Sequence, residues 1–182
     1  ENNPNFDVFK QSLIKEIEKD YNKYDCILGT KFSVSNYKFS KIIKNHLWEF
    51  LKDPKLIFSK KNRNLKLHFD LFHGKGNLDL AADLLDYKHK IEFKNYMNEN
   101  TEFNPHNMFI CKKEILKDYY EIIFPWLEKC ETIFGFDNSE VYGKKRIYGF
   151  LAERFMSFWF NKNYKIKELN IIGNDLSNYK NL

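Results

Sequence analysis

The segment from residue 143 to residue 161 constrains the fold of this chain more than any other, because it requires both a buried helix and a partner for a charge. At 100° per residue its apolar side chains fall on one stripe, formed by Ile147, Phe150, Leu151, Phe155 and Phe158. Arg154 falls inside this stripe. A guanidinium stays protonated and is costly to bury alone, so Arg154 needs an acidic partner or an anionic ligand.

A neighbouring face of the same helix carries polar residues, namely Arg146, Gly149, Glu153 and Ser157. Gly149 leaves room for a ligand to approach the backbone. Arg154 is therefore a candidate for binding an anion. The alternative is that Arg154 pairs with a core carboxylate and that Glu153 is solvated.

The rest of the chain reads as a mixed, helix-rich α/β fold in a single domain over residues 1–182. Apolar side chains at helical spacing predict helices over residues 5–22, 38–52, 77–85, 87–98 and 112–134. Short apolar runs predict strands over residues 24–29, 107–111 and 165–172. Residues 55–76 have no clear periodicity and are predicted to be irregular. The expected architecture is a small sheet flanked by helices.

The charge pattern argues against a nucleic-acid partner. The net charge is +5, but Arg63, Arg146 and Arg154 are the only Arg among 30 basic residues. Lys alternates with Glu and Asp along most of the chain, as on a solvated face, whereas nucleic-acid binders cluster their basic residues and favour Arg. The one basic cluster, at residues 60–66, is predicted to be an exposed loop with a modest attraction to anionic lipid or diphosphate.

The chain has three cysteines, and their odd number and apolar surroundings predict buried free thiols in a reducing compartment. They are Cys26, Cys111 and Cys130. No apolar run reaches the roughly 18 residues that a membrane span requires.

The segment from His68 to Asn77 is a candidate binding region. On a strand, His68 and Asp70 would share a face, and His73 would lie beside a Gly-Lys-Gly turn that opens a helix at Asn77. Backbone amides at such a helix start can bind phosphate. A metal site of two His and one Asp is conceivable, although the spacing matches no specific ligand pattern. The alternative is a polar loop followed by a capped helix.

A second candidate region precedes the strand predicted at residues 107–111. His106 and Asn107 carry donor and acceptor groups directly before this buried run, and such residues at a sheet edge commonly line a pocket. The alternative is that Asn104 forms a turn before Pro105 and that His106 is a surface residue.

Glu92 and Lys94 form a Glu-x-Lys pattern with Asp83 or Asp86 upstream. On a strand, this arrangement is typical of Mg²⁺-dependent nucleases, in which carboxylates hold the metal and the Lys orients the attacking water. Patterns of three residues also arise by chance in a chain rich in Lys and Glu, and the periodicity of residues 88–98 favours a helix.

Several segments taken together resemble a known family. They are His106-Asn107-Met108-Phe109-Ile110-Cys111-Lys112-Lys113-Glu114, Tyr119-Tyr120-Glu121 with Phe124-Pro125-Trp126-Leu127, the run Arg146-Ile147-Tyr148-Gly149-Phe150-Leu151-Ala152-Glu153-Arg154-Phe155, and Lys165 to Leu169. The chain resembles a bacterial capsular and exopolysaccharide biosynthesis family, catalogued as a domain of unknown function. Its members look like glycosyltransferases with a GT-A-like nucleotide-sugar fold.

This resemblance implies the C-terminal, acceptor-side portion of a larger sugar transferase. The family's N-terminal His-Tyr-Arg-Arg segment is not found in this sequence, nor is an Asp-x-Asp that would hold Mn²⁺ or Mg²⁺ on the donor. The implied reaction moves a sugar from a nucleotide-sugar donor to a glycan or lipid-linked acceptor, in the cytoplasm or at the inner face of the membrane.

The resemblance also implies roles for individual residues. Glu153 would be the general base, and Arg146 and Arg154 would hold diphosphate or glycan charge. The remaining substrate-binding residues would be Asp70, His73, His106 and Asn107. The alternative to an enzyme is a noncatalytic module that binds a glycan or a partner protein, and the nuclease is a third hypothesis.

Overall fold

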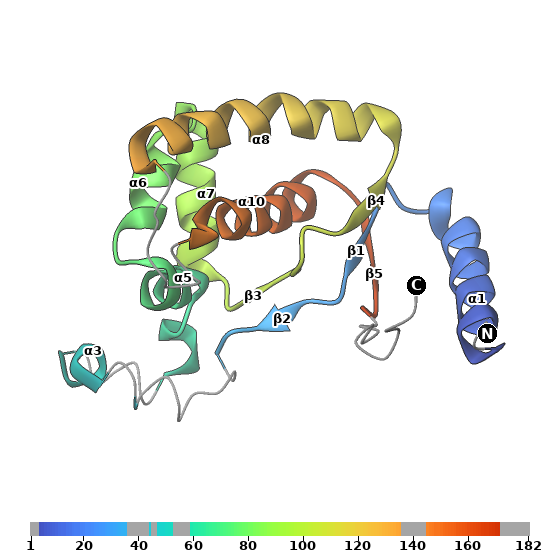
Figure 1. Cartoon of the computed structure of the whole chain (residues 1–182), viewed down its shortest axis with the longest axis horizontal. Coiled ribbons are helices and arrows are strands. Elements are labelled where there is room, and N and C mark those ends of the chain that lie inside the picture. The colour runs from blue at the N-terminus through green and yellow to red at the C-terminus, as the bar shows by residue number, and fades with distance from the viewer. Residues whose placement is uncertain (1–3, 36–43, 45–46, 53–58, 136–144, 172–182) are drawn as a thin grey trace, which may run out of the picture.

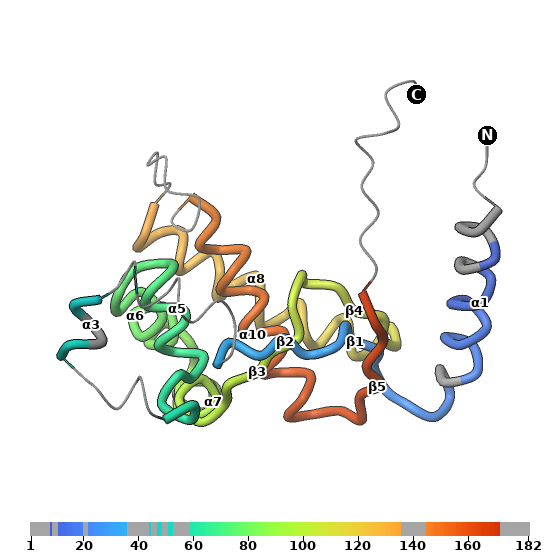
Figure 2. Tube along the Cα trace, turned by 90° about the horizontal axis from the view of Figure 1, so that it is seen from below, coloured from blue at the N-terminus to red at the C-terminus, as the bar shows by residue number. Residues whose placement is uncertain are grey.

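The computed structural model describes residues 4–35, 44, 47–52, 59–135 and 145–171. A body of helices occupies one side of the molecule, a small sheet lies beside it, and the first helix stands apart beyond the sheet (Figures 1 and 2). Within the described ranges, no helix combines the length and apolar character that crossing a bilayer requires.

Helix α10, Ile147–Asn163, lies in the middle of the helical body (Figure 1). Helix α8, Lys113–Phe134, packs along one side of it and helix α7, Tyr87–Glu99, contacts it from another. Helices α5, Leu65–His73, and α6, Asn77–Asp83, pack against α7 and against each other. Since α10 is surrounded in this way, Ile147, Leu151, Phe155 and Phe158 of its apolar stripe are buried as the sequence predicts, and Phe150 is half-buried.

Strand β1, Cys26–Gly29, is the centre of a three-stranded sheet. It pairs antiparallel with β4, Phe109–Cys111, and parallel with β5, Ile166–Leu169. All four β1 residues are buried, which explains its uninterrupted apolar run. A second sheet consists of β2, Phe32–Ser33, and β3, Glu102–Phe103, which are too short to be predicted from periodicity.

Most of the predicted elements are confirmed. The predicted strands correspond to β1, β4 and β5, and the helix predicted at residues 5–22 is α1, Pro4–Tyr21. The helices predicted at residues 77–85, 87–98, 112–134 and 143–161 are α6, α7, α8 and α10. Of the helix predicted at residues 38–52, the structure describes α3, Leu47–Lys52, and residue 44, and the remainder lies outside the described residues.

The prediction for residues 55–76 is wrong, because this range contains α5 and a short 3₁₀ turn at Lys60–Asn62. Asn64 begins α5 by accepting a 2.9 Å hydrogen bond from the amide of Leu67. The buried side chains Leu65, Phe69 and His73 recur every fourth residue. A histidine completes this stripe, so the apolar pattern was too weak to reveal the helix.

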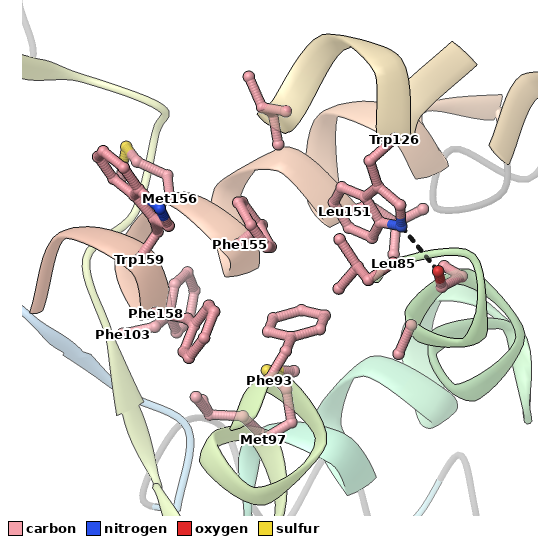
Figure 3. Packing of buried hydrophobic residues seen from close by; sticks show 14 of the residues in the cluster. Leu85, Phe93, Met97, Phe103, Trp126, Leu151, Phe155, Met156, Phe158 and Trp159 are labelled. Carbon is pink, nitrogen blue, oxygen red and sulfur yellow. Dashed lines mark hydrogen bonds between the residues drawn. The ribbon is translucent and has the colours of Figure 1, made fainter. Parts of the chain in front are cut away.

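Aromatic rings hold the helices together (Figure 3). The Phe155 ring lies 5.6 Å from that of Phe93, 5.1 Å from that of Trp126 and 5.6 Å from that of Phe158, measured between centroids. Trp126 donates a 2.7 Å hydrogen bond from Nε1 to the carbonyl of Ala81, which ties α8 to α6. The aromatic content of 18% is therefore used in the contacts between helices.

We expect Phe155→Ala to lower the free energy of unfolding by roughly 3–5 kcal/mol, because it opens a cavity at a fully buried site. Urea denaturation measures this change. The matched control is Phe124→Ala on α8, where the ring is 59% exposed and the expected loss is below about 1 kcal/mol. Equal losses in the two variants would contradict the assignment of Phe155 to the core.

Candidate functional site

Arg154 is the centre of a polar cluster on α10, and its side chain is only 2% exposed. Its Nη1 lies 2.7 Å from Oε2 of Glu153, and its Nη2 lies 3.4 Å from Nδ1 of His68 on α5. The guanidinium carbon sits 3.4 Å from the centroid of the Phe103 ring, a cation–π contact. Of the two partners expected for Arg154, an acidic side chain or an anionic ligand, the structure shows the acidic side chain, and it is Glu153.

The buried charge affects the groups around it. Burial lowers the pKa of Arg154 to about 10, against the opposing effect of Glu153, so the guanidinium is still cationic at neutral pH. Burial, together with the charges of Arg154 and His73, lowers the pKa of His68 to about 3. His68 is therefore neutral at physiological pH, and its Nδ1 can accept a hydrogen bond from Arg154.

Glu153 joins α10 to the loop between β3 and β4. Its Oε1 accepts a 2.5 Å hydrogen bond from the backbone amide of His106, and Asn107 donates a 3.0 Å bond from Nδ2 to the carbonyl of Gly149. His106 and Asn107 have φ angles of 75° and 50°, a left-handed conformation that is unfavourable for residues with side chains. These two hydrogen bonds therefore hold a strained turn against α10.

A second set of hydrogen bonds, on Asn104, supports the same loop from inside. Asn104 is fully buried, its Nδ2 donates a 2.6 Å bond to the carbonyl of Gly29, and its amide donates a 2.9 Å bond to Oγ of Ser157. Its Oδ1 accepts bonds from Ser157 and from Asn161. The alternative that Asn104 forms a turn before Pro105 does not account for its burial, because its side chain links β1 to α10. In the sequence, an Asn before a Pro does not reveal whether the Asn forms a turn or is buried.

Two more predicted residues lie close to the start of α10. The ring of His73 on α5 stacks on Phe150 at 4.1 Å with an interplanar angle of 25°. The guanidinium carbon of Arg146 lies 6.0 Å from the centroid of the same Phe150 ring. Gly149 has open space where a side chain would project. The structure thus brings His73, Arg146 and the loop with Asn107 to one end of α10.

Asp70 is separate from this group. Its Oδ1 accepts a 3.1 Å bond from the amide of Gly76 and its Oδ2 a 2.9 Å bond from Lys66, so it stabilises the turn between α5 and α6. The prediction that Asp70 and His68 share a strand face is wrong, because both are on a helix. Asn77 is the first residue of α6, preceded by Gly76 at φ 84°. Asn77 itself donates a 2.8 Å bond to the carbonyl of His73.

The Glu-x-Lys pattern lies on helix α7 and not on a strand. Lys94 pairs with Asp83 at 2.8 Å, and Glu92 pairs with Lys162 of α10. Both side chains are therefore used in contacts between helices, and the strand geometry that the nuclease hypothesis needs is not formed. Among the residues that the structure describes, His, Cys, Asp and Glu form no group of three suited to a metal ion.

A groove of about 720 Å³ lies beside the β3–β4 loop. Its walls come from the chain that follows β1, from the loop that precedes β4 and from the chain that follows β5. The lining residues are Thr30, Lys31, Phe32, Pro105, His106, Met108, Asn170 and Ile171. His106 belongs to both features, since its amide is bound by Glu153 and the residue lines the groove.

Comparison with known proteins identifies the class and then the family. The fold resembles that of the apo structure of WbbM, a bifunctional glycosyltransferase, with a TM-score of 0.62 and 19% sequence identity over 86% of this chain. The predicted class, a mixed, helix-rich and GT-A-like α/β fold, is thereby confirmed. Residues 15–164 match a family described as a domain of unknown function, DUF4422, and the chain belongs to that family.

This chain spans 25% of the length of the WbbM chain that it matches. Comparison with curated proteins found no match. The family match begins at residue 15, well before residues 103–170, where the sequence motifs are concentrated. The resemblance therefore extends over the end of the first helix, the central strand and the α5–α7 region as well.

The lowered pKa of His68 predicts a pH-dependent stability. Because the pKa is depressed in the folded state, this contribution is fully present above the unfolded value of 6.5 and is lost as the pH falls toward 3. Between pH 7 and pH 5 we expect His68 to account for roughly 1–2 kcal/mol of lost stability. His68→Gln keeps a hydrogen-bond acceptor but cannot titrate, so its stability should fall less over this range.

Urea denaturation at the two pH values measures this difference. The control is Phe124→Ala, which removes an exposed ring and no titratable group, so it should show the wild-type pH dependence. The same pH dependence in His68→Gln and in the wild type would contradict the burial of a neutral His68 beside Arg154.

Proposed function

We propose that this chain is part of a glycosyltransferase and that the cluster around Glu153 contributes to its sugar-transfer site. The observation that carries the proposal is the carboxylate of Glu153, which is fixed between the buried Arg154 and the amide of His106. The family and the GT-A-like fold support it. The proposed donor is a nucleotide sugar, and the proposed acceptor is a glycan or lipid-linked glycan of bacterial capsule or exopolysaccharide biosynthesis. The proposed location of the reaction is the cytoplasm or the inner face of the membrane.

In this proposal Glu153 is the general base. Each of its oxygens accepts one hydrogen bond within the protein, and a carboxylate oxygen has a second lone pair. The side chain is 12% exposed, so one edge can be reached by a ligand. In an inverting transfer, Glu153 would take the proton of an acceptor hydroxyl while that oxygen attacks the anomeric carbon and the nucleoside diphosphate leaves.

Arg154, Arg146 and His73 take different roles in this proposal. Arg154 is buried and already bound to Glu153, so we assign it to positioning the carboxylate. Arg146 is exposed at the start of α10 and is the better candidate for holding a diphosphate. His73 stacks on Phe150 and shapes the surface between them, while Asp70 acts only through the α5–α6 turn.

A divalent metal does not fit the described residues. Glu153 is engaged by Arg154 and by the His106 amide, and Asp70 by Lys66 and the Gly76 amide. A cation at either carboxylate would have to displace a positive charge. These two carboxylates therefore offer no site for Mn²⁺ or Mg²⁺. A transfer assay with and without EDTA tests whether the reaction depends on a metal.

The groove beside His106 is the proposed acceptor site. Phe32 and Met108 provide apolar surface for the C–H faces of sugar rings, and Lys31 provides donors for their hydroxyls. Asn107 holds the strained turn next to this groove by its bond to Gly149. Its role in substrate binding is thus to fix the position of His106.

A noncatalytic glycan-binding module is the second candidate function. It is favoured by the observation that both oxygens of Glu153 are already bonded inside the protein, so that the cluster could serve only to hold the loop. Both candidates predict glycan binding in the groove, and they differ in whether a nucleotide sugar is consumed.

We expect Glu153→Gln to lower sugar transfer by at least about 100-fold, because the amide cannot accept the hydroxyl proton. The assay follows release of nucleoside diphosphate from a panel of nucleotide sugars in the presence of glycan acceptors. Glu128→Gln, at an exposed position of α8, is the matched control and should transfer at the wild-type rate. Circular dichroism checks that both variants are folded.

If Glu153→Gln does not fold, Glu153→Asp provides the test, because it keeps the charge near Arg154 and withdraws the carboxylate by one methylene. Transfer within a few-fold of the wild type in either folded variant would exclude Glu153 as the base. No nucleotide-sugar turnover by the wild type, together with glycan binding, would favour the noncatalytic module.

We expect Met108→Asp to weaken glycan binding by about tenfold, because it places a charge on the apolar wall of the groove. Met108 is 47% exposed, so the substitution should leave the stability nearly unchanged. Titration calorimetry or acceptor KM measures the effect. Ile133→Asp on α8 is a control of similar exposure, 54%, and equal weakening in both variants would place the glycan elsewhere.

A further inference from the structure

Cys26 and Cys111 lie directly opposite each other on neighbouring strands. Cys26 is at the start of β1, Cys111 is at the end of β4, and the antiparallel register pairs the two residues. Both are free thiols, Cys26 buried and Cys111 partly exposed. Directly opposite residues of an antiparallel ladder have neighbouring side chains on the same face of the sheet, so the two thiol groups are cross-strand neighbours.

The hydrogen bonds of β1 show which kind of pair this is. The amide of Thr30 donates a 2.9 Å bond to the carbonyl of Leu169 in β5, and the amide of Cys26 donates a 3.4 Å bond to the carbonyl of Lys165 next to β5, which also accepts a 2.9 Å bond from the amide of Asp25. Amides of alternate residues in a strand point to the same side, so the backbone of Cys26 is directed toward β5 and away from β4. Cys26 and Cys111 are therefore a non-hydrogen-bonded pair of the antiparallel ladder.

Such pairs have the closest side chains in an antiparallel sheet, with Cα atoms about 4.5 Å apart. A disulfide requires Cα atoms about 4.4–6.8 Å apart. The backbone of the pair is thus already within the range of a disulfide, at its short end. Cys130 has no such partner in the described structure, because it is buried on α8.

We propose that Cys26 and Cys111 form a redox modification site, at which a small-molecule disulfide such as oxidised glutathione converts the two thiols into an intramolecular disulfide. Cys111 reacts first, because it is the partly exposed member of the pair. A small-molecule disulfide can reach the sulfur of Cys111, whereas Cys26 is enclosed in the centre of the sheet.

The reaction proceeds in two exchanges. The Cys111 thiolate attacks one sulfur of the oxidant, a mixed disulfide forms, and one small-molecule thiolate leaves. The Cys26 thiolate then attacks the Cys111 sulfur and expels the second small-molecule thiolate. The two protein thiols give up two protons and two electrons, and the oxidant becomes two molecules of thiol.

The burial of the two thiols determines how fast they are oxidised. Burial raises the pKa of Cys26 to about 12 and also raises that of Cys111. Only a small fraction of either thiol is ionised at neutral pH, so oxidation is slow there. Because the thiolate is the reactive form, the rate should rise by up to about tenfold for each pH unit between 7 and 9.

A disulfide between Cys26 and Cys111 would restrain the strands that lead into the groove. The β1–β4 ladder has the cysteines at one end and Leu28 opposite Phe109 at the other. Beyond that other end, Thr30 follows β1 and Met108 precedes β4, and both residues line the groove. A disulfide would close a long loop of the chain and restrain the ladder from which both walls emerge.

The test uses the 182-residue chain in oxidised glutathione at pH 8.5. Mass spectrometry of the intact protein should show a loss of 2 Da, and peptide mapping without reduction should join the peptides of Cys26 and Cys111. The thermal unfolding midpoint should rise by roughly 5 °C or more, and dithiothreitol should reverse both changes. Peptide mapping of the wild type needs no substitution, so the result does not depend on the folding of a variant.

Cys111→Ser removes the partly exposed thiol and should abolish the 2 Da loss, whereas Cys130→Ser should leave it unchanged. A disulfide that involves Cys130, a disulfide between two chains, or a stable glutathione adduct on Cys111 that never closes onto Cys26 would each overturn the proposal. These outcomes are independent of sugar transfer and leave the proposed function as it stands.

Discussion

The burial of one positive charge organises this molecule. Arg154 occupies a core position on α10, where water cannot solvate it, and its charge is balanced by the residue before it in the chain, Glu153. Because Glu153 also binds the His106 amide, the loop between β3 and β4 is fixed by the same ion pair. His68 of α5 and the Phe103 ring close the cluster from the other sides. A buried ion pair contributes little net stability, so its value here lies in specifying how helix, loop and sheet meet.

Long periodic segments were predictable from the sequence. Helices α7, α8 and α10 and the central strand β1 each carry an apolar pattern that local spacing reveals. Helix α5 was missed because His73 takes a core position in its stripe, and a histidine is read as polar. The strands β2 and β3 have two residues each, and their pairing depends on chain segments about seventy residues apart, which no local pattern encodes.

The residue types of the candidate site were predictable from the sequence, but the hydrogen bonds and the ion pair that join them were not. The sequence indicated that Arg154 needs an acidic partner or an anionic ligand, and the helical spacing placed Glu153 on a different face. The short contact between these adjacent residues depends on side-chain rotation, and the engagement of His106 through its backbone amide depends on the left-handed turn. Asn104 was misjudged for a similar reason, since its burial is decided by Ser157 and Gly29, which approach it from distant parts of the chain.

The topology of the small sheet bears on how this chain folds. Strand β1 comes early in the sequence, but one of its neighbours is β4, Phe109–Cys111, and the other is β5, Ile166–Leu169. Local contacts cannot form this sheet, and contacts between distant segments slow folding. During synthesis the apolar strand Cys-Ile-Leu-Gly must therefore wait with both edges unpaired until most of the chain has left the ribosome.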